Sequence, residues 1–270
     1  AGFPFFQLDR HLKVLVQDLN RYVAISEEFP NDEIEKLKAG GLMHTRRVSR
    51  VITPGTLIDE NFMDPFSHCY ILAIHIDNST NQIQESTPES ILHKSSLTSV
   101  GLAWIDLSTG HFFTQHTNLA ELPSVLARIT PREIVLDESL KNTNHHDIFN
   151  VLAEDSYFIS YTKRLDIKQI SEWTSMLESP VPIRSAKEFM PQEIIAGSFL
   201  LQYVEDRLLG SNIKLQPPIR QLNLMSIDKN TMRALEIRKN FMGDSIVGSL
   251  LHAIRHTVTK GGARLLDRWL

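Results

Sequence analysis

The order of apolar segments in the middle of the chain most constrains its fold. Residues 68–76, 100–106 and 111–114 are short runs rich in Ile, Leu, Val and aromatic side chains, which is typical of buried strands. Because the turn Asp-Leu-Ser-Thr-Gly at 106–110 joins the last two runs, we expect a meander of three strands. Residues 77–98 are dominated by Asn, Ser, Thr, Gln and Glu, which indicates a solvated insertion.

Helical and strand patterns alternate after the meander. We expect helices at 118–129, 147–153 and 165–177, and strands at 133–136 and 157–161. This alternation indicates an α/β architecture with a partly parallel sheet. A meander followed by alternating α and β units is the order expected of a ribonuclease H-like fold.

The N-terminal section has a pattern of its own. Leu8, Leu12, Leu15 and Leu19 recur at helical spacing, which predicts a helix over 7–19 with one buried face. The strands predicted next are at 22–25 and 47–53, with an exposed loop between them at 29–41. The pair Pro54-Gly55 ends the second strand, so we place a domain boundary just after it.

The C-terminal section follows a linker at Pro180-Val181-Pro182. An apolar face predicts a helix over 193–209, opened by Pro191 and closed by Gly210, and an alternating pattern predicts a strand at 222–226. At the end, Gly261 and Gly262 supply permissive backbone before a helix with an unpaired apolar face. That face carries Leu265, Leu266, Trp269 and Leu270. We therefore expect the chain to be a fragment of a longer protein.

Composition limits the functions open to the chain. Its 270 residues carry a formal net charge of −4, with a pI near 6.3, so the chain lacks the global basic character of many nucleic-acid binders. Any contact with nucleic acid must therefore be local, or be made by parts of the protein outside this sequence. The single cysteine, Cys69, excludes an internal disulfide and lies in an apolar run, where we expect it to pack. No apolar run approaches the roughly 20 residues that a membrane span needs, so we expect no membrane partner.

Motifs along the chain resemble one protein family. Residues 257–270, TVTKGGARLLDRWL, follow the spacing T-x-T-x-x-G-x-R-x-L-x-x-W-L. The other matching segments are AGFP at 1–4, RVITPGT at 50–56, DLSTG at 106–110, IIAGSFLLQY at 194–203 and TMRALEI at 231–237. Taken in the order in which they occur along the chain, these segments resemble the MutS-type DNA mismatch repair proteins. The insertion at 77–98, the extra residues after Gly210, and Lys260, where many relatives carry proline, depart from the family pattern.

The resemblance implies three parts in family order. Residues 1–56 would be the C-terminal part of an α+β mismatch-binding domain, 57–183 a ribonuclease H-like connector domain, and 184–270 the start of a mostly helical core, or lever, domain. The family's mismatch-reading motif, an aromatic residue followed two residues later by Glu, is expected before Ala1. For the fragment alone, we expect weak, salt-sensitive DNA binding without preference for a mispair.

The resemblance also implies what the full-length protein does. It would clamp DNA as a dimer with a second MutS-type subunit, recognise mispairs, couple recognition to binding and hydrolysis of ATP with Mg²⁺, and offer a surface to a MutL-type protein. The P-loop pattern G-x-x-x-x-G-K-[ST] does not occur in this sequence, so Gly40-Gly41 and Gly261-Gly262 are weak phosphate loops. For the fragment we expect no cofactor and no ATP hydrolysis. The segments AGFPFFQLDR and GGAR resemble the fungal mitochondrial branch, which implies a mitochondrial location; the nucleus is the alternative.

The clearest local cluster of positive charge consists of Arg46, Arg47 and Arg50. Such side chains pair with DNA phosphates without reading the base sequence. The alternative is a solvated strand face on which the arginines form ion pairs with Glu27, Glu28 or Asp59. Arg10 and Lys13 on the first predicted helix have the same two interpretations.

A metal-dependent nuclease is the alternative function. Ribonuclease H-like nucleases place acids at strand ends to bind two metal ions, and Asp77, Asp106 and Asp137 each follow a predicted strand. Asp is also common at such positions because it accepts backbone hydrogen bonds in turns and caps. The two interpretations predict different geometry, since only a nuclease needs the three carboxylates together.

Two histidine pairs invite a metal interpretation. In His145-His146-Asp147, adjacent side chains point in different directions, and Asp147 suits a helix N-cap. His252 and His256 have the spacing of one helix face and could chelate zinc. Because no further ligand is evident, we expect surface or packing histidines and no metal site. The serines lack a G-x-S-x-G context, so the sequence does not support a hydrolase triad.

Overall fold

The fold is that of a computed structural model in which most of the chain can be described. The described residues are 5–30, 44–56, 68–77, 98–142, 147–153, 155, 157–208, 213–222, 225–242 and 245–270. The interior of the predicted insertion, 78–97, lies outside them, as do Gly210 and residues 31–43, which include most of the exposed loop predicted at 29–41.

A six-stranded mixed sheet forms the centre of the molecule, with the strand order β7-β6-β3-β4-β5-β8. Its strands are β3 Tyr70–Ile76, β4 Ser99–Asp106, β5 His111–Asn118, β6 Glu133–Asp137, β7 Ile159–Thr162 and β8 Ile219–Arg220. β3, β4 and β5 pair antiparallel, whereas β6 is parallel to β3 and β7 is parallel to β6. The predicted meander and the predicted partly parallel sheet are therefore confirmed.

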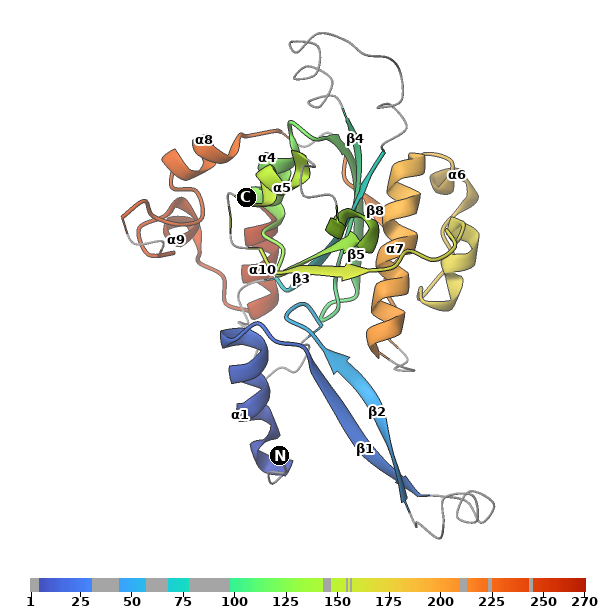
Figure 1. The fold of residues 1–270 in the computed structure, drawn as a ribbon. Coiled ribbons are helices and arrows are strands. Elements are labelled where there is room, and N and C mark those ends of the chain that lie inside the picture. Colours follow the sequence, from blue (N-terminus) through green and yellow to red (C-terminus); the bar gives the residue numbers. More distant parts are fainter. Residues whose placement is uncertain are drawn as a thin grey trace.

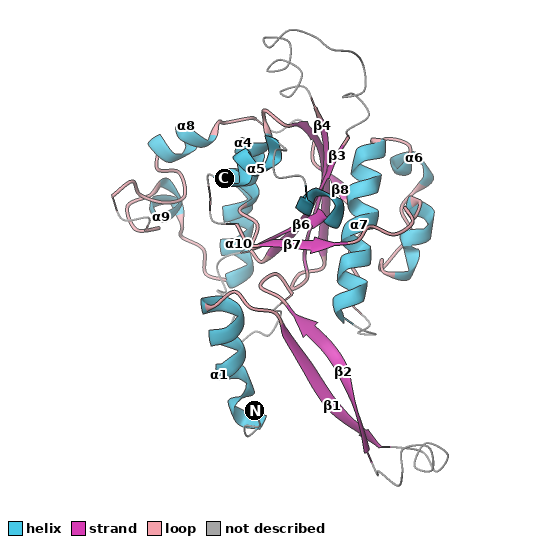
Figure 2. Ribbon diagram, viewed as in Figure 1, coloured by secondary structure: helices cyan, strands magenta, loops and turns pink. Residues whose placement is uncertain are grey.

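Helices cover both faces of this sheet (Figure 1, Figure 2). Successive side chains of a strand point to opposite faces, so Ile71 and Ala73 of β3 join one core and Leu72 and Ile74 join the other. The first core is closed by α7 Pro191–Leu208. The second is closed by α4 Leu122–Ile129 and α5 Asp147–Ala153. Two buried faces explain why the central strands are continuous apolar runs.

The long helix α7 lies close against the sheet. The helix starts at Pro191, as predicted. Proline suits this position because the N–H that it lacks would have no partner in the first turn of a helix. A Cβ atom on Gly197 would lie 2.5 Å from the Trp173 ring, and one on Gly101 of β4 would lie 2.0 Å from the Gln192 carbonyl oxygen. Glycine at these two positions therefore permits the close packing on which the first core depends.

The N-terminal section forms a helix and a hairpin that extend away from the sheet (Figure 1). The helical segment comprises a 3-10 turn Phe5–Gln7, α1 Leu8–Leu12 and a π-helical turn Lys13–Asp18. Its buried residues are Leu12 and Val16, whereas Leu15 and Leu19 are 37% and 55% exposed. The predicted helix is confirmed, but the predicted buried face is only partly correct, since Val16 packs with Ile52 at the end of the hairpin.

The hairpin consists of β1 Val23–Pro30 and β2 His44–Ile52. The prediction that the first strand ends at Ile25 is wrong, because β1 continues through its charged residues to Pro30. Cross-strand pairing explains the extension, since Glu27 lies opposite Arg47 and Glu28 opposite Arg46. Opposite charges across a ladder stabilise a strand that has little apolar surface to bury.

Two predictions for residues 165–226 differ from the structure. The helix expected at 165–177 is only a 3-10 helix, Ile170–Ser175, because the segment before it is bound to α7: the Lys168 N–H donates to Ser198 Oγ at 2.8 Å. Of the strand expected at 222–226, residues 223 and 224 lie outside the described residues, and the described residues 222, 225 and 226 are not in a strand; the strand in this region is β8, which pairs with β5. Arg220 of β8 forms an ion pair at 2.8 Å with the buried Glu193 of α7. This contact favours a strand at 219–220, earlier in the chain than the predicted strand.

The C-terminal section is helical, with α6 Ile183–Ala186, α8 Lys229–Ala234, α9 Leu250–Ile254 and α10 Lys260–Trp269. Gly261 and Gly262 lie inside the first turn of α10, which corrects the expectation that they precede the helix. Thr259 is the N-cap, and its side chain accepts from the Gly262 N–H at 3.0 Å. Trp269 is 73% exposed, in agreement with the predicted unpaired apolar face. Within the described residues, no helix is long and apolar enough to cross a membrane.

Candidate functional site

A buried carboxylate joins the hairpin to the sheet and to α7. Glu133 opens β6 and is fully buried. Its Oε2 accepts hydrogen bonds from Thr53 Oγ1 at 2.5 Å and from the Gly55 N–H at 2.9 Å. Its Oε1 accepts from the Tyr203 hydroxyl at 2.5 Å and from the Ser160 hydroxyl. These residues, together with Tyr22, form what we call the Glu133 junction.

The turn at Gly55 and two tyrosines complete the Glu133 junction. A Cβ atom on Gly55 would lie 2.4 Å from Ile71 and 2.8 Å from Glu133, so only glycine lets the turn close on the carboxylate. Tyr22 donates to Ser160 Oγ at 2.6 Å. Burial raises the pKa of the Tyr203 hydroxyl, and the charge of Glu133 raises it further; burial likewise raises the pKa of Tyr22. Both phenols therefore remain donors at physiological pH.

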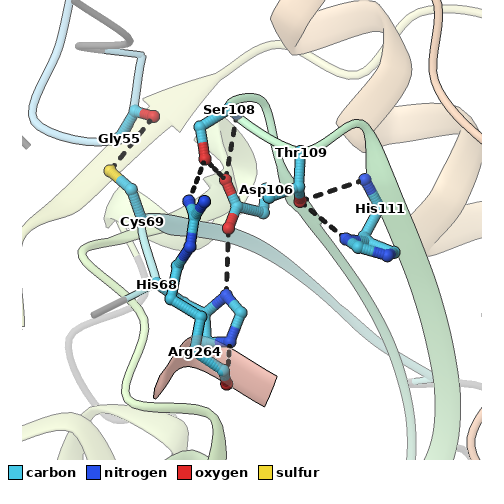
Figure 3. Close-up of polar contacts among 8 residues, drawn as sticks. All are labelled: Gly55, His68, Cys69, Asp106, Ser108, Thr109, His111 and Arg264. Atoms are coloured by element: carbon cyan, nitrogen blue, oxygen red, sulfur yellow. Dashed lines mark hydrogen bonds and ion pairs between the residues drawn. The ribbon is translucent and has the colours of Figure 1, made fainter. Parts of the chain in front are cut away.

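A second polar cluster, the His68 junction, joins the sheet to α10 (Figure 3). It consists of His68, Asp106, Ser108 and Arg264. Asp106 Oδ2 lies 3.0 Å from His68 Nδ1, and Oδ1 accepts from the Ser108 N–H and hydroxyl at 3.0 and 2.6 Å. His68 Nε2 donates to the Arg264 carbonyl at 2.9 Å, and Arg264 Nη1 donates to Ser108 Oγ at 3.2 Å.

The carboxylate in this second junction is stabilised in its charged form. Burial alone would raise the pKa of Asp106, but hydrogen bonds from His68 and Ser108 outweigh burial and leave the pKa below its ordinary value. The DLSTG turn thus has a structural role, because its first residue holds both the turn and the segment before β3.

Cys69 is next to both junctions. Its thiol lies 3.6 Å from the Pro54 carbonyl and 3.7 Å from the Gly55 carbonyl. Burial raises its pKa to about 12. A thiol that stays protonated at neutral pH is a poor nucleophile, which agrees with the expectation that Cys69 packs.

The structure places Arg46, Arg47 and Arg50 on β2 of the projecting hairpin. Arg46 donates to Glu28 Oε1 at 2.7 Å, with the two side chains 77% and 54% exposed. This contact matches the ion-pair interpretation for Arg46, and the hydrogen bond from Arg46 lowers the pKa of Glu28. Asp59, the other proposed partner, lies outside the described residues.

A bulge determines which of the three arginines share a face. The register shifts between Ile25 and Ser26, so Arg50 lies opposite Ile25 and Arg47 lies opposite Glu27. Because residues opposite each other share a face and faces alternate along β1, Arg47 and Arg50 lie on one face and Arg46 on the other. Arg47 and Arg50 both have further polar or ring interactions.

The three acids of the nuclease alternative do not come together. β3 and β4 are antiparallel, with Tyr70 opposite Asp106, so Asp106 and Asp77 lie at opposite ends of the strand pair. Asp77 accepts from Gln192 at 3.0 Å, and Asp137 accepts from the Ser139 N–H at 2.9 Å. The acids act in turns and packing contacts, and the geometry gives the nuclease alternative no support.

The candidate metal ligands are also separated or outside the described chain. His145 and His146 lie outside it, as do Gly40 and Gly41. His252 is in α9, whereas His256 follows the end of that helix, so the two do not share a helix face. Throughout the described ranges, no group of three His, Cys, Asp or Glu side chains could hold a metal ion.

Sequence reasoning did not identify Glu133, Tyr203 or His68. One signal was available for Glu133, because it begins the apolar run Glu-Ile-Val-Leu of a strand buried on both faces. A charged residue there must have buried partners. Thr53, Gly55 and Tyr203 are 70 to 80 residues away from Glu133 and Ser160 is 27 residues away, and local patterns do not reveal partners at such separations.

Comparison with known proteins identifies the family. Models of MutS domain I, domain II and domain III match residues 1–61, 87–216 and 230–270. Proteins named DNA mismatch repair protein MutS align with the whole chain at 32% identity in Rickettsia felis, 33% in Rickettsia rickettsii and 30% in Wolbachia pipientis. The chain spans 29%, 29% and 30% of the length of these relatives.

The three domain models follow one another in a single order. The domain I model covers the hairpin, the domain II model covers β4 to β7 with α7, and the domain III model covers α9, α10 and nearly all of α8. The ATPase domain is not among the matched parts. The chain therefore belongs to the MutS family, of which it carries domains I, II and III.

Proposed function

We propose that the chain is the part of a DNA mismatch repair protein that connects the recognition of mispaired DNA to ATP binding and hydrolysis elsewhere in the full-length protein. The observation that carries the proposal is the match to three successive MutS domains, supported by relatives named for mismatch repair. In this proposal, the chain itself has no catalytic residue.

The mechanical role rests on the two polar junctions. The Glu133 junction ties the hairpin to the sheet, and the His68 junction ties α10 to the same sheet. Domain II would thereby hold both neighbours and pass a displacement of one to the other, which requires discrete packing arrangements and no chemistry. The strand order, with an antiparallel meander followed by parallel β6 and β7, supports describing this domain as ribonuclease H-like.

Contact with DNA is assigned in this proposal to β2 of the hairpin, at Arg47 and Arg50, with Arg46 on the opposite face. Positive side chains on a projecting element can reach phosphates, and each contact makes binding more sensitive to salt. We expect Arg47→Gln with Arg50→Gln to weaken binding of a fluorescent duplex by about tenfold or more at low salt and to reduce the salt dependence.

Arg184→Gln is the matched control, since Arg184 is an exposed arginine on the short helix α6. Fluorescence anisotropy with a matched and a G·T duplex measures both affinity and mispair preference. Equal loss in the control and the double variant would remove the assignment to β2. A preference of this chain for the G·T duplex would contradict the expected absence of mispair reading.

The remaining parts of the proposal concern the full-length protein. We propose that it acts as a dimer with a second MutS-type subunit, binds ATP and Mg²⁺ outside the present chain and contacts a MutL-type protein. Light scattering and ATPase assays of the full-length protein, with and without mispaired DNA, test the first two. An ATPase rate that mispaired DNA does not change would contradict the proposed coupling.

The subfamily proposed is the fungal mitochondrial branch, with the nuclear subunits as the alternative. It rests on the resemblance of AGFPFFQLDR and of GGAR at 261–264 to that branch. The location follows from the subfamily, so a fluorescent fusion of the full-length protein that stains nuclei and not mitochondria would reject both.

A further inference from the structure

His68 holds two acceptors at once. The residue lies just before β3, and its ring spans from Asp106 Oδ2, 3.0 Å from Nδ1, to the Arg264 carbonyl oxygen of α10, 2.9 Å from Nε2. The His68 side chain is 8% exposed and that of Asp106 is fully buried. Because a carbonyl oxygen can only accept, the Nε2 atom must carry a proton.

The state of Asp106 decides the other ring nitrogen. Asp106 Oδ1 already accepts two hydrogen bonds from Ser108, and the lowered pKa of Asp106 agrees with a charged carboxylate. A carboxylate can only accept, so Nδ1 must carry a proton as well. Both ring nitrogens are then donors, which only the positively charged imidazolium provides.

We propose that His68 is an imidazolium ion that clasps α10 to the sheet, with one ring proton on Asp106 and the other on the Arg264 carbonyl (Figure 3). The contact to α10 is through the main chain, so it fixes the position of the helix whatever side chain residue 264 has. The bond from Arg264 Nη1 to Ser108 adds a second attachment at the same point. The clasp concerns how α10 is held and does not depend on any contact of the chain with DNA.

The ring stacking around His68 is compatible with a cation. The Tyr70 ring stacks on His68, with centroids 4.6 Å apart and planes 14° apart, and an aromatic face attracts a positive charge. Of the charged side chains near the junction, Asp267 is negative, and Arg238, Arg264 and Arg268 are positive. Burial, followed by the charge of Arg268, lowers the pKa of His111 in β5, and the His111 ring lies 2.7 Å from Thr109 Oγ1.

A nuclear magnetic resonance spectrum of the chain labelled with ¹⁵N at histidine tests the protonation state directly. At pH 7, we expect both ring nitrogens of His68 to show the shifts of protonated nitrogen, each coupled to its own proton. The His68 signals are assigned by their loss in His68→Gln, or by contacts with the Tyr70 ring in the unmodified chain if that variant does not fold. A signal of unprotonated nitrogen from the His68 ring would overturn the proposal.

Hydrogen exchange tests the clasp itself. In His68→Gln, one side-chain amide cannot span both acceptors, so we expect amides in 263–270 to exchange about tenfold faster, as for loss of a hydrogen bond to a charged group. The matched control is His116→Gln, because His116 is an exposed histidine of the same sheet that bonds Ser99 at 2.8 Å. Unchanged exchange in α10, or an equal change in the control, would show that His68 does not hold the helix.

Discussion

A fully buried carboxylate such as Glu133 is tolerated in a protein interior only when donors replace the water that it gives up. Glu133 has four such donors, from Thr53, Gly55, Ser160 and Tyr203. Glu133→Ala would leave all four buried without their acceptor. We expect it to lower the free energy of unfolding by about 3–5 kcal/mol, because each buried donor left without an acceptor costs about 1–3 kcal/mol.

Urea unfolding followed by circular dichroism measures this loss. Glu178→Ala is the control, since Glu178 is an exposed glutamate that follows Leu177 of the first core, and we expect it to change stability by about 0.5 kcal/mol or less. A loss below about 1 kcal/mol in Glu133→Ala would mean that the four hydrogen bonds contribute little to stability.

We expect the side chain of His75 in β3 to make the stability of the fold depend on pH. Burial, followed by the charge of Arg164, lowers the pKa of His75 to about 4, and Arg164 donates to its Nδ1 at 3.1 Å. The unfolded chain takes up a proton below a pH of about 6.5, whereas folded His75 does so only near pH 4. The stability that neutral His75 contributes is therefore present above about pH 6.5 and is lost as the pH falls toward 4.

Comparison of unfolding at pH 7 and pH 5 with that of His75→Gln checks this linkage. Because glutamine does not titrate, we expect the variant to lose less stability than the unmodified chain between the two pH values. Identical losses would mean that His75 does not contribute to the acid sensitivity of the fold.

Among the elements, α7 depends most on close approach. Gly197 leaves room for the Trp173 ring, and a methyl group there would lie 2.5 Å from the ring. Gly197→Ala must shift either the 3-10 helix that carries Trp173 or α7 itself, and we expect a destabilisation of about 1–3 kcal/mol, typical of overpacking. The midpoint of urea unfolding measures the effect.

Gly261→Ala is the informative comparison for this prediction. Gly261 lies in the first turn of α10, where no atom is within 4 Å of an added Cβ. Alanine in a helix is favoured over glycine, so we expect no loss and a gain of up to about 1 kcal/mol. Equal destabilisation by both variants would indicate backbone conformation as the cause and exclude the contact with Trp173.

At the scale of the whole molecule, the sheet and the hairpin differ in how they are supported. The centres of β3 and β4 are buried on both faces, whereas the outer half of the β1–β2 hairpin is largely exposed. A two-stranded ribbon is marginally stable without packing. We expect the amides of 71–74 and 102–105 to exchange slowest and those of 27–29 and 45–48 at least about a hundredfold faster.

Native-state hydrogen exchange with mass spectrometry resolves these segments. Protection of the outer hairpin equal to that of the central strands would show that the Glu133 junction stabilises the hairpin along its whole length. The expected gradient places the support at its base, where Thr53 and Gly55 meet Glu133.

The family, the antiparallel meander, the partly parallel sheet and the helices at 147–153 and after Pro191 were all predictable from the sequence. Each of these predictions depends on residue spacing within one segment, or on the apolar composition of a strand that is buried on both faces. A single segment of the sequence therefore contains the pattern that predicts it. The extent of β1 and the short 3-10 helix at Ile170–Ser175 were not predictable in this way. Cross-strand charges decided the first, and contacts with α7 decided the second.

The sequence by itself determined that the chain belongs with the MutS proteins and in what order its strands and helices occur. Only the tertiary structure decided which polar groups meet: His68 with Asp106 and the Arg264 carbonyl, and Glu133 with Tyr203 and the turn at Gly55. The acids at strand ends looked equivalent in sequence, but antiparallel pairing put Asp106 at the opposite end from Asp77. The physical reason is that hydrogen bonds between buried groups depend on distances in space, which local sequence patterns do not encode.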